Sequence, residues 1–167
     1  NENVLNADGD LNGDGANLTK WTPIGSRSDP YTGTFDGDGH TISGLYVDIS
    51  SSSYVYAGLF GYISGGTVKN LSIADSYISV SASGTNCAAN VGGVCGYNNG
   101  GTIENCSNSA TVTVSATVDY ILAYVGGVCG YNYATITNCY NTGTVSGTGT
   151  GNAYVGGVCG INYGYNG

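Results

Sequence analysis

A six-residue motif, Val-Gly-Gly-Val-Cys-Gly, occurs three times in this chain, at residues 91–96, 125–130 and 155–160. The copies lie 34 and then 30 residues apart, and residues 57–62 carry a related version. A second motif of the form Gly-Thr-Ile-x-Asn-Cys recurs between them, at residues 66–71, 101–106 and 134–139. A repeat period in this range is typical of solenoids, propellers and arrays, in which each unit buries its apolar face against its neighbours.

Within one repeat, apolar residues alternate with small polar ones, as in Thr-Val-Thr-Val at residues 111–114, and Gly and Asn mark the turns between the short segments. Propeller blades are usually longer, at about 40 residues, and a propeller must close into a ring. Three or four shorter copies cannot close one. The repeats therefore predict an all-β fold, a parallel β-solenoid built from repeats of 30–35 residues.

Equivalent positions of successive turns of such a solenoid stack about 4.8 Å apart. The repeat alignment predicts one interior ladder of four residues: Phe60, Cys95, Cys129 and Cys159. The residues immediately before them are expected to alternate to the opposite face of the sheet: Leu59, Val94, Val128 and Val158. The larger Phe60 side chain favours the first ladder as the buried one.

Charge and hydropathy each exclude one class of partner. The chain of 167 residues has only 3 Lys or Arg side chains and a net charge of -8, so no basic patch can neutralise a run of phosphates, and no nucleic acid partner is expected. It has no apolar stretch near the roughly 18 residues that a membrane-spanning helix requires, so no membrane insertion is expected.

The two repeated motifs, preceded by Trp-Thr-Pro-Ile-Gly at residues 21–25 and by residues 35–45, resemble the GLUG-motif repeats of bacterial surface and adhesin-like proteins. Such repeats also occur beside the catalytic region of IgA-cleaving metallopeptidases. The resemblance extends from about residue 21 to the C-terminus. It implies a right-handed parallel β-solenoid without catalytic residues of its own. His40 is the sole histidine, and no zinc-peptidase motif is present.

The N-terminal part differs from the repeats. Residues 1–48 contain 8 of the 11 carboxylates, both prolines and Trp21, which is typical of an atypical terminal unit that caps a solenoid. We expect residues 1–48 to form N-terminal capping rungs of the same domain and residues 49–167 to form the GLUG-like repeats. The last repeat stops before its second motif. Its open edge predicts stacking against flanking repeats of the same chain or end to end against another copy.

An acidic loop is a candidate metal site. Alternate oxygen-bearing side chains followed by Gly15 resemble an EF-hand-type calcium loop, with these possible ligands: Asp8, Asp10, Asn12 and Asp14. The twelfth position holds Trp21 instead of a bidentate carboxylate, so the alternative is a solvated Asp-Gly turn. Calcium is thus the one cofactor that the sequence suggests, and otherwise none is expected.

A second group of polar residues suggests acid–base chemistry. Asp36, Asp38 and His40 could act together in glycoside cleavage by a β-helix enzyme, but Asp-Gly-Asp-Gly is also turn chemistry in its own right. The turn interpretation is favoured, and no enzyme activity is expected.

Five of the six cysteines and three asparagines recur at repeat positions. Cys95, Cys129 and Cys159 share one position and Cys106 and Cys139 another, and the cysteines are expected to be buried free thiols, with disulfides as the alternative. The asparagines are expected to form a ladder at a corner of the solenoid: Asn70, Asn105 and Asn138.

The tyrosines are the candidate ligand-binding residues. Five lie in Asn- and Gly-rich turns: Tyr97, Tyr131, Tyr133, Tyr163 and Tyr165. Flat aromatic rings beside amides suit a sugar ring or a protein surface, although tyrosines at repeat positions can also simply stack on each other.

These features favour a non-catalytic structural repeat module of an extracellular bacterial protein, either an adhesin stalk or a self-stacking fibre subunit. The alternative is a module that binds host glycans or proteins through its turn tyrosines, and a polysaccharide-degrading enzyme is the least favoured hypothesis.

Overall fold

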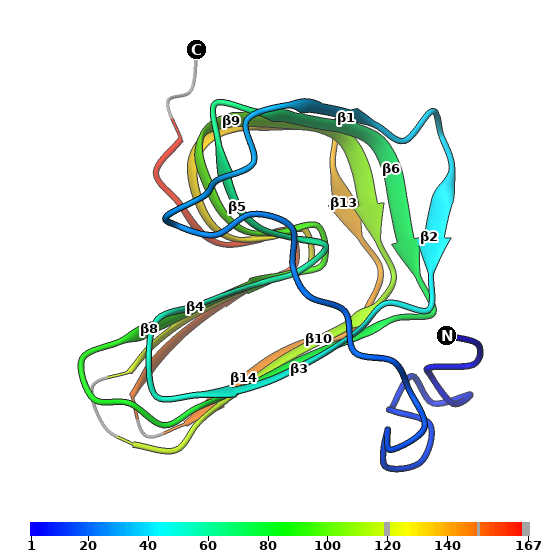
Figure 1. The fold of residues 1–167 in the computed structure, drawn as a ribbon, viewed down its shortest axis with the longest axis vertical. Helices are drawn as coiled ribbons and strands as arrows, with labels where there is room; N and C mark the ends of the chain where they lie inside the picture. Colours follow the sequence, from blue (N-terminus) through cyan, green and yellow to red (C-terminus); the bar gives the residue numbers. More distant parts are fainter. Residues whose placement is uncertain (119–120, 150, 165–167) are drawn as a thin grey trace.

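The computed structural model describes residues 1–118, 121–149 and 151–164. In these residues it has sixteen β-strands and no helix, and every pair of strands is parallel. The strands stack as a β-solenoid of about four turns, seen approximately end-on in Figure 1. The predicted fold class, an all-β parallel β-solenoid, is confirmed.

The largest sheet curves around one side of the cross-section (Figure 1). It follows the order β1-β6-β9-β12-β16, and β2, β5 and β13 pair with members of this path. Its strands are β1 (Thr34–Asp36), β2 (Thr41–Ser43), β5 (Phe60–Ser64), β6 (Thr67–Ala74), β9 (Cys95–Asn108), β12 (Cys129–Thr137), β13 (Tyr140–Asn141) and β16 (Cys159–Asn162).

Two four-stranded sheets form the other, flatter arm of the cross-section. One has the order β14-β10-β7-β3 and contains β3 (Tyr46–Ser51), β7 (Tyr77–Ala82), β10 (Thr111–Ala116) and β14 (Val145–Gly149). The other has the order β15-β11-β8-β4 and contains β4 (Val55–Ala57), β8 (Ala88–Gly92), β11 (Leu122–Gly126) and β15 (Asn152–Gly156). Each turn of the solenoid therefore adds one strand to each of these two sheets.

The motif Val-Gly-Gly-Val-Cys-Gly forms the connection from the β15-β11-β8-β4 sheet to the largest sheet. Cys95 pairs with Phe60 on one side and with Cys129 on the other, and Cys129 pairs with Cys159. Phe60, Cys95 and Cys129 have no exposed surface. The structure thus places this ladder in the interior.

The neighbouring ladder does not face outward, as the alternation of a strand would require. Leu59, Val94 and Val128 are also buried, at 3%, 0% and 0% exposure, and Val158 packs against the core. The expectation of an outer face for these residues is wrong. They lie in the bend between two strands, where the side-chain alternation is interrupted, so both ladders fill the core.

The second glycine of the motif is required because other parts of the chain approach its backbone closely. A Cβ atom on Gly93 would collide with the Asn108 side chain and with the backbone oxygen of Gly127. Asn108 is buried there, and its Nδ2 donates hydrogen bonds to Ala110 O at 3.1 Å and to Asn141 Oδ1 at 2.8 Å. The second glycine therefore makes room for a buried amide ladder.

The corner asparagines have a left-handed backbone. Asn70, Asn105 and Asn138 have φ values of 54°, 51° and 52°, a region that Asn tolerates better than most residues. Asn105 Nδ2 donates to Asn70 Oδ1 at 3.1 Å, and Asn70 Nδ2 donates to Asp36 Oδ1 at 3.0 Å. Asn70 and Asn105 thus both adopt the corner conformation and bond along the stack.

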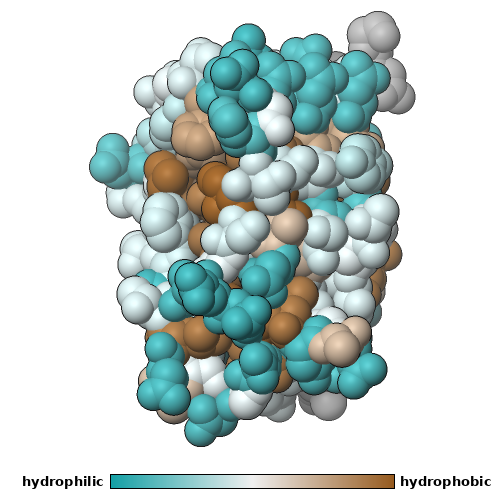
Figure 2. Space-filling view, turned by 90° about the vertical axis from the view of Figure 1, so that its right-hand side faces the viewer, coloured by the Kyte–Doolittle hydropathy of each residue, from teal (hydrophilic) through white to brown (hydrophobic). Residues whose placement is uncertain are grey.

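The N-terminal part has two components. Residues 21–45 continue the solenoid before the first full turn, with parallel bridges from Ile24 to Phe60 and from Tyr31 to Ile63. The preceding residues lie against the outer face of the β3-β7-β10 sheet, where Thr111 Oγ1 donates to Gly9 O at 2.5 Å and Leu5 N donates to Asp75 Oδ1 at 3.0 Å. Figure 2 shows hydrophobic residues scattered between hydrophilic ones on this side of the molecule.

Burial decreases towards the last turn. Val91 and Val125 have no exposed surface, whereas Val155, which pairs with Val125 in the same register, is 45% exposed. Over the described residues, no further strand covers β14, β15 and β16. The core is therefore closed in the middle of the solenoid and open at this end.

Candidate functional site: a tyrosine groove

A column of stacked tyrosines runs along the outer face of the largest sheet. Tyr62 of β5, Tyr97 of β9 and Tyr131 of β12 share one register position. The ring centroids of Tyr62 and Tyr97 are 4.8 Å apart and those of Tyr97 and Tyr131 are 4.6 Å apart, with interplanar angles of 3° and 7°. These distances match the spacing between strands, so the stacking follows directly from the register.

A second column lies on the adjacent sheet. Tyr56 of β4, Asn90 of β8, Tyr124 of β11 and Tyr154 of β15 share one register position. The two columns touch edge to face where the sheets meet: Tyr56 contacts Tyr62 with centroids 5.2 Å apart, and Tyr124 contacts Tyr131 at 5.1 Å. The two outer faces therefore converge on one concave, tyrosine-lined groove.

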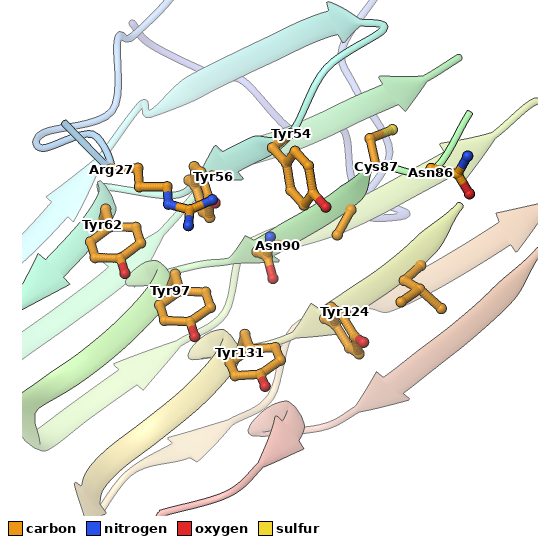
Figure 3. A pocket seen from close by; sticks show the side chains of 12 residues that line it. Arg27, Tyr54, Tyr56, Tyr62, Asn86, Cys87, Asn90, Tyr97, Tyr124 and Tyr131 are labelled. Atoms are coloured by element: carbon orange, nitrogen blue, oxygen red, sulfur yellow. The ribbon is translucent and has the colours of Figure 1, made fainter. Parts of the chain in front are cut away.

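Asn90 interrupts the second column. Its position lies between Tyr56 and Tyr124, and its smaller side chain leaves a cavity of about 440 Å³ in the groove (Figure 3). We call this cavity the tyrosine pocket. It is lined by Arg27, Tyr54, Tyr56, Tyr62, Asn86, Cys87, Ala88, Asn90, Tyr97, Leu122, Tyr124 and Tyr131.

The pocket differs electrostatically from the rest of this acidic chain. Arg27 is the one charged residue among those that line it. The two lysines are both ion-paired, Lys20 with Asp48 at 2.6 Å and Lys69 with Asp36 at 3.2 Å. Arg27 forms no ion pair with the residues that the structure describes. The pocket therefore combines phenol and amide groups with one positive charge and no carboxylate.

Packing in the groove favours the neutral form of its phenols. Burial, assisted by the neighbouring tyrosines, raises the pKa of Tyr97 to about 12 from an ordinary value of 10.0. Burial also raises the pKa of Tyr56, with a smaller opposing effect from the nearby Arg27 guanidinium. Neither hydroxyl is therefore an activated nucleophile or base at neutral pH.

The structure brings together only some of the tyrosines singled out from the sequence. Tyr97 and Tyr131 line the pocket, while Tyr133 and Tyr163 are exposed at 44% and 54%. The Tyr163 ring contacts Tyr131 at 5.6 Å, beyond the pocket. Tyr165 lies outside the described residues.

The second wall of the groove was not among the residues predicted from the sequence. Tyr124 and Tyr154 precede the Val-Gly-Gly motif in two repeats, so this repeat position was a usable signal. Tyr62 ends the related motif at residues 57–62 and so shares the repeat position of Tyr97 and Tyr131, which was a signal as well. Arg27 could not be assigned in this way, because it lies outside the repeated motifs.

The acidic loop of the predicted calcium site uses its polar atoms within the chain. Asn6 Oδ1 accepts the backbone N–H groups of Asp8 and Asp10, both at 2.9 Å, and Asp14 Oδ1 accepts that of Ala16 at 2.9 Å. Asn12 Nδ2 donates to Asn3 O at 3.1 Å. In the described part of the chain, no three His, Cys, Asp or Glu side chains converge as a metal site. Calcium binding here stays a prediction from sequence.

The second acidic motif forms a turn. Asp38 has a φ of 50°, and His40 N donates to Gly37 O at 2.8 Å. Asp36 accepts hydrogen bonds from Asn70 and from the backbone of Asp38 and pairs with Lys69, and these contacts lower the pKa of its carboxyl group. An ionised, fully engaged carboxylate is a poor general acid.

The six cysteines are free thiols in this structure. Cys106 and Cys139 interact: the backbone N–H of Cys106 donates to Cys139 Sγ at 3.4 Å. The Cys106 thiol and this N–H favour the Cys139 thiolate, so the pKa of Cys139 is lowered.

Comparison with known proteins confirms the resemblance seen in the sequence. The sequence model of the GLUG motif matches residues 88–113 and 122–146, which contain the strands from β8 to the start of β10 and from β11 into β14. The chain therefore contains GLUG-motif repeats, and the repeats carry the pocket residues Asn90, Tyr97, Tyr124 and Tyr131.

Two curated proteins are similar over part of this chain. A protein named "Putative Gly-rich membrane protein" from Evansella cellulosilytica is 36% identical over 64 residues, which is 38% of this chain and 7% of that protein. Halomucin from Haloquadratum walsbyi is 46% identical over 59 residues, 34% of this chain and 1% of that protein. The chain thus spans only a small part of these relatives. No solved structure matches it.

Proposed function

We propose that this chain is a non-catalytic structural segment of a cell-surface protein, in which successive turns of the solenoid stack on one another as a stalk or fibre. The observation that carries the proposal is the contrast between Val125, which is fully buried, and Val155, which is 45% exposed at the equivalent position of the last described turn. The same position is apolar in each turn but is buried only where a further turn follows.

The edge formed by β14, β15 and β16 is suited to such stacking. Its strands are in register with the preceding turn, so their free backbone groups can pair with another turn of the same kind. The side-chain ladder continues as well: Asn98 Nδ2 donates to Asn132 Oδ1 at 2.8 Å, and Asn132 Nδ2 donates to Asn162 Oδ1 at 2.7 Å. The partner is a further repeat, from this chain or from a second copy.

The relatives favour a surface location. The name of one refers to a Gly-rich membrane protein and that of the other to a halomucin. The structure has no helix that could span a membrane among its described residues. From the names of these relatives, we propose that the repeats lie at the cell surface.

Sedimentation velocity over a range of concentrations tests the stacking proposal. The chain should associate as its concentration rises, and Val155→Lys should prevent this because it places a charge on the exposed core edge. Ser81→Lys is a matched control: it places the same charge at an exposed position of β7, an inner strand with neighbours on both sides, away from either end of the stack. A chain that stays monomeric at every concentration, or a Val155→Lys variant that associates as the wild type does, would contradict the proposal.

Electron microscopy of the associated material separates the two forms of the proposal. Filaments would indicate that both ends of the solenoid are assembly surfaces and favour a fibre. Discrete pairs would indicate that only the β14-β15-β16 edge stacks, which favours a stalk segment with the N-terminal part as its cap.

A further inference from the structure

The tyrosine pocket exists because one turn breaks a repeated pattern. Tyr124 and Tyr154 stack with ring centroids 5.3 Å apart, and Tyr56 occupies the same column one position above Asn90. A tyrosine at position 90 would continue this column. Asn90 instead leaves a cavity of about 440 Å³, which lies within the usual range for small-molecule sites.

Asn90 also supplies a hydrogen-bonding group to this cavity. The residue is only 3% exposed, and its Nδ2 donates to Val55 O at 3.2 Å. In the described residues, no hydrogen bond to Asn90 Oδ1 is found and no buried side-chain oxygen lacks a partner, so this oxygen is open to the pocket. It points into the space between Tyr97 and Tyr124 (Figure 3), where it can accept a hydrogen bond from a ligand.

The tyrosines restrict the kind of ligand. Tyr62, Tyr97 and Tyr131 stack face to face, so their ring faces are occupied by each other and their hydroxyl ends point the same way along the groove (Figure 3). The second column adds ring surface from Tyr56 and Tyr124 on either side of Asn90. A compact ring that carries several hydroxyl groups fits such a mixture of aromatic surface and phenol groups.

The charge of the pocket restricts the class of ligand further. Arg27 is the one cation of the chain's three that forms no ion pair with a described residue, and it lies at the pocket. No carboxylate lines the pocket, although the chain as a whole has a net charge of -8. Arginine recognises carboxylates through paired hydrogen bonds.

We propose that the tyrosine pocket binds an acidic sugar residue of a polysaccharide, a role that goes beyond the structural one. The sugar ring packs against Tyr56 and Tyr124, and one of its hydroxyl groups donates to Asn90 Oδ1. Its carboxylate pairs with Arg27. The site recognises a uronic acid without cleaving it, because no acid–base pair lines the pocket.

Isothermal titration calorimetry with two defined probes tests this proposal. The probes are trigalacturonate and the neutral trisaccharide cellotriose, each at low and at moderate salt. The wild-type chain should bind trigalacturonate at least tenfold more tightly than cellotriose, and salt should reduce this preference because part of it is electrostatic.

Three variants locate the site. Asn90→Tyr fills the cavity with the side chain found at this position in other turns, and it should weaken the binding of trigalacturonate at least tenfold. Arg27→Gln should remove the preference for the acidic probe. Tyr154→Ser alters the same column outside the pocket and should leave binding unchanged.

Several results would overturn the assignment. These are the absence of saccharide binding by the wild type, unchanged affinity in a folded Asn90→Tyr variant, or an acidic preference that survives Arg27→Gln. Arg27 is exposed, so its variant decides the question even if Asn90→Tyr does not fold. A triglutamate peptide that binds as tightly as trigalacturonate, with the same sensitivity to Asn90→Tyr, would assign the pocket to acidic peptides instead.

Discussion

Tyr97 and Tyr131 are 34 residues apart in sequence, yet their rings stack with centroids 4.6 Å apart and planes 7° apart. The stack follows from the parallel register of β9 and β12, which places equivalent residues of successive turns directly above one another. A change at one repeat position therefore has a measurable counterpart in the next turn.

The second glycine of the repeated motif should be essential in the middle of the solenoid and dispensable at its end. Gly93→Ala should lower the free energy of unfolding by about 1–3 kcal/mol or more, because its Cβ would collide with Asn108 and Gly127. Gly157→Ala, at the equivalent position of the last turn, meets no atom within 4 Å and should change stability by less than about 0.5 kcal/mol. Urea denaturation measures both, and equal losses would contradict the assigned register.

Truncating a core side chain should also cost more stability in the middle of the solenoid than towards its last turn. Ile103 has no exposed surface and pairs with Ile136, which is only partly buried. Ile103→Ala should cost about 2–5 kcal/mol of stability, the range for a large buried side chain. Ile136→Ala should cost clearly less, because part of its side chain is already in contact with water. Chemical denaturation that ranks the two variants in the reverse order would argue against an open C-terminal end.

The contribution of a corner asparagine to stability can be divided into a backbone part and a side-chain part. Asn105→Ala should be the more damaging change, because it keeps a Cβ at a φ of 51° and removes the bond to Asn70. Asn105→Gly removes the same bond but tolerates the backbone conformation, so it should be more stable than Asn105→Ala by about 1–2 kcal/mol. Thermal unfolding of the two variants provides the comparison, and equal midpoints would exclude a left-handed corner at residue 105.

Stability should fall in strong alkali through the groove tyrosines. The pKa of Tyr97 is about 12 in the folded chain and 10.0 without burial, so above pH 10 the unfolded chain loses this proton first. This contribution to the free energy of unfolding is present in full below pH 10 and is lost as the pH rises to about 12. Tyr97→Phe removes the titrating group and should show a smaller decline over the same range. Denaturation of the wild type and of Tyr97→Phe at a series of pH values measures this decline in stability. Identical pH profiles for the two proteins would contradict the burial of the Tyr97 hydroxyl.

Cys139 should be more reactive than the cysteine beside it, Cys106. The pKa of Cys139 is lowered and that of Cys106 is raised, so the Cys139 thiolate forms at a lower pH, and the thiolate is the form that alkylating agents attack. Iodoacetamide labelling followed by peptide mass spectrometry should therefore detect modified Cys139 before modified Cys106 as the pH is raised. Cys106→Ala removes the thiol that stabilises this thiolate and should shift the labelling of Cys139 to higher pH. No shift would show that the pair does not interact.

The repeats predicted the solenoid because each motif has a simple geometric meaning. The spacing of Cys95, Cys129 and Cys159 was enough to place three strands in one register. The inward orientation of Val94 beside Cys95 was not predictable, since it depends on the bend between β8 and β9. The pocket was only half predicted for a related reason: Tyr97 and Tyr131 lie in recognisable motifs, whereas Asn90 matters because a tyrosine is missing there.

Amide hydrogen exchange tests the central claim, that stacked turns stabilise the chain and that its last described turn is a stacking surface. In dilute solution, amides of β8 and β11, which have neighbours on both sides, should exchange far more slowly than those of β14, β15 and β16. Raising the protein concentration should then slow exchange selectively in those last three strands. Uniform protection along the chain, or concentration-dependent protection elsewhere but not in these strands, would contradict the account.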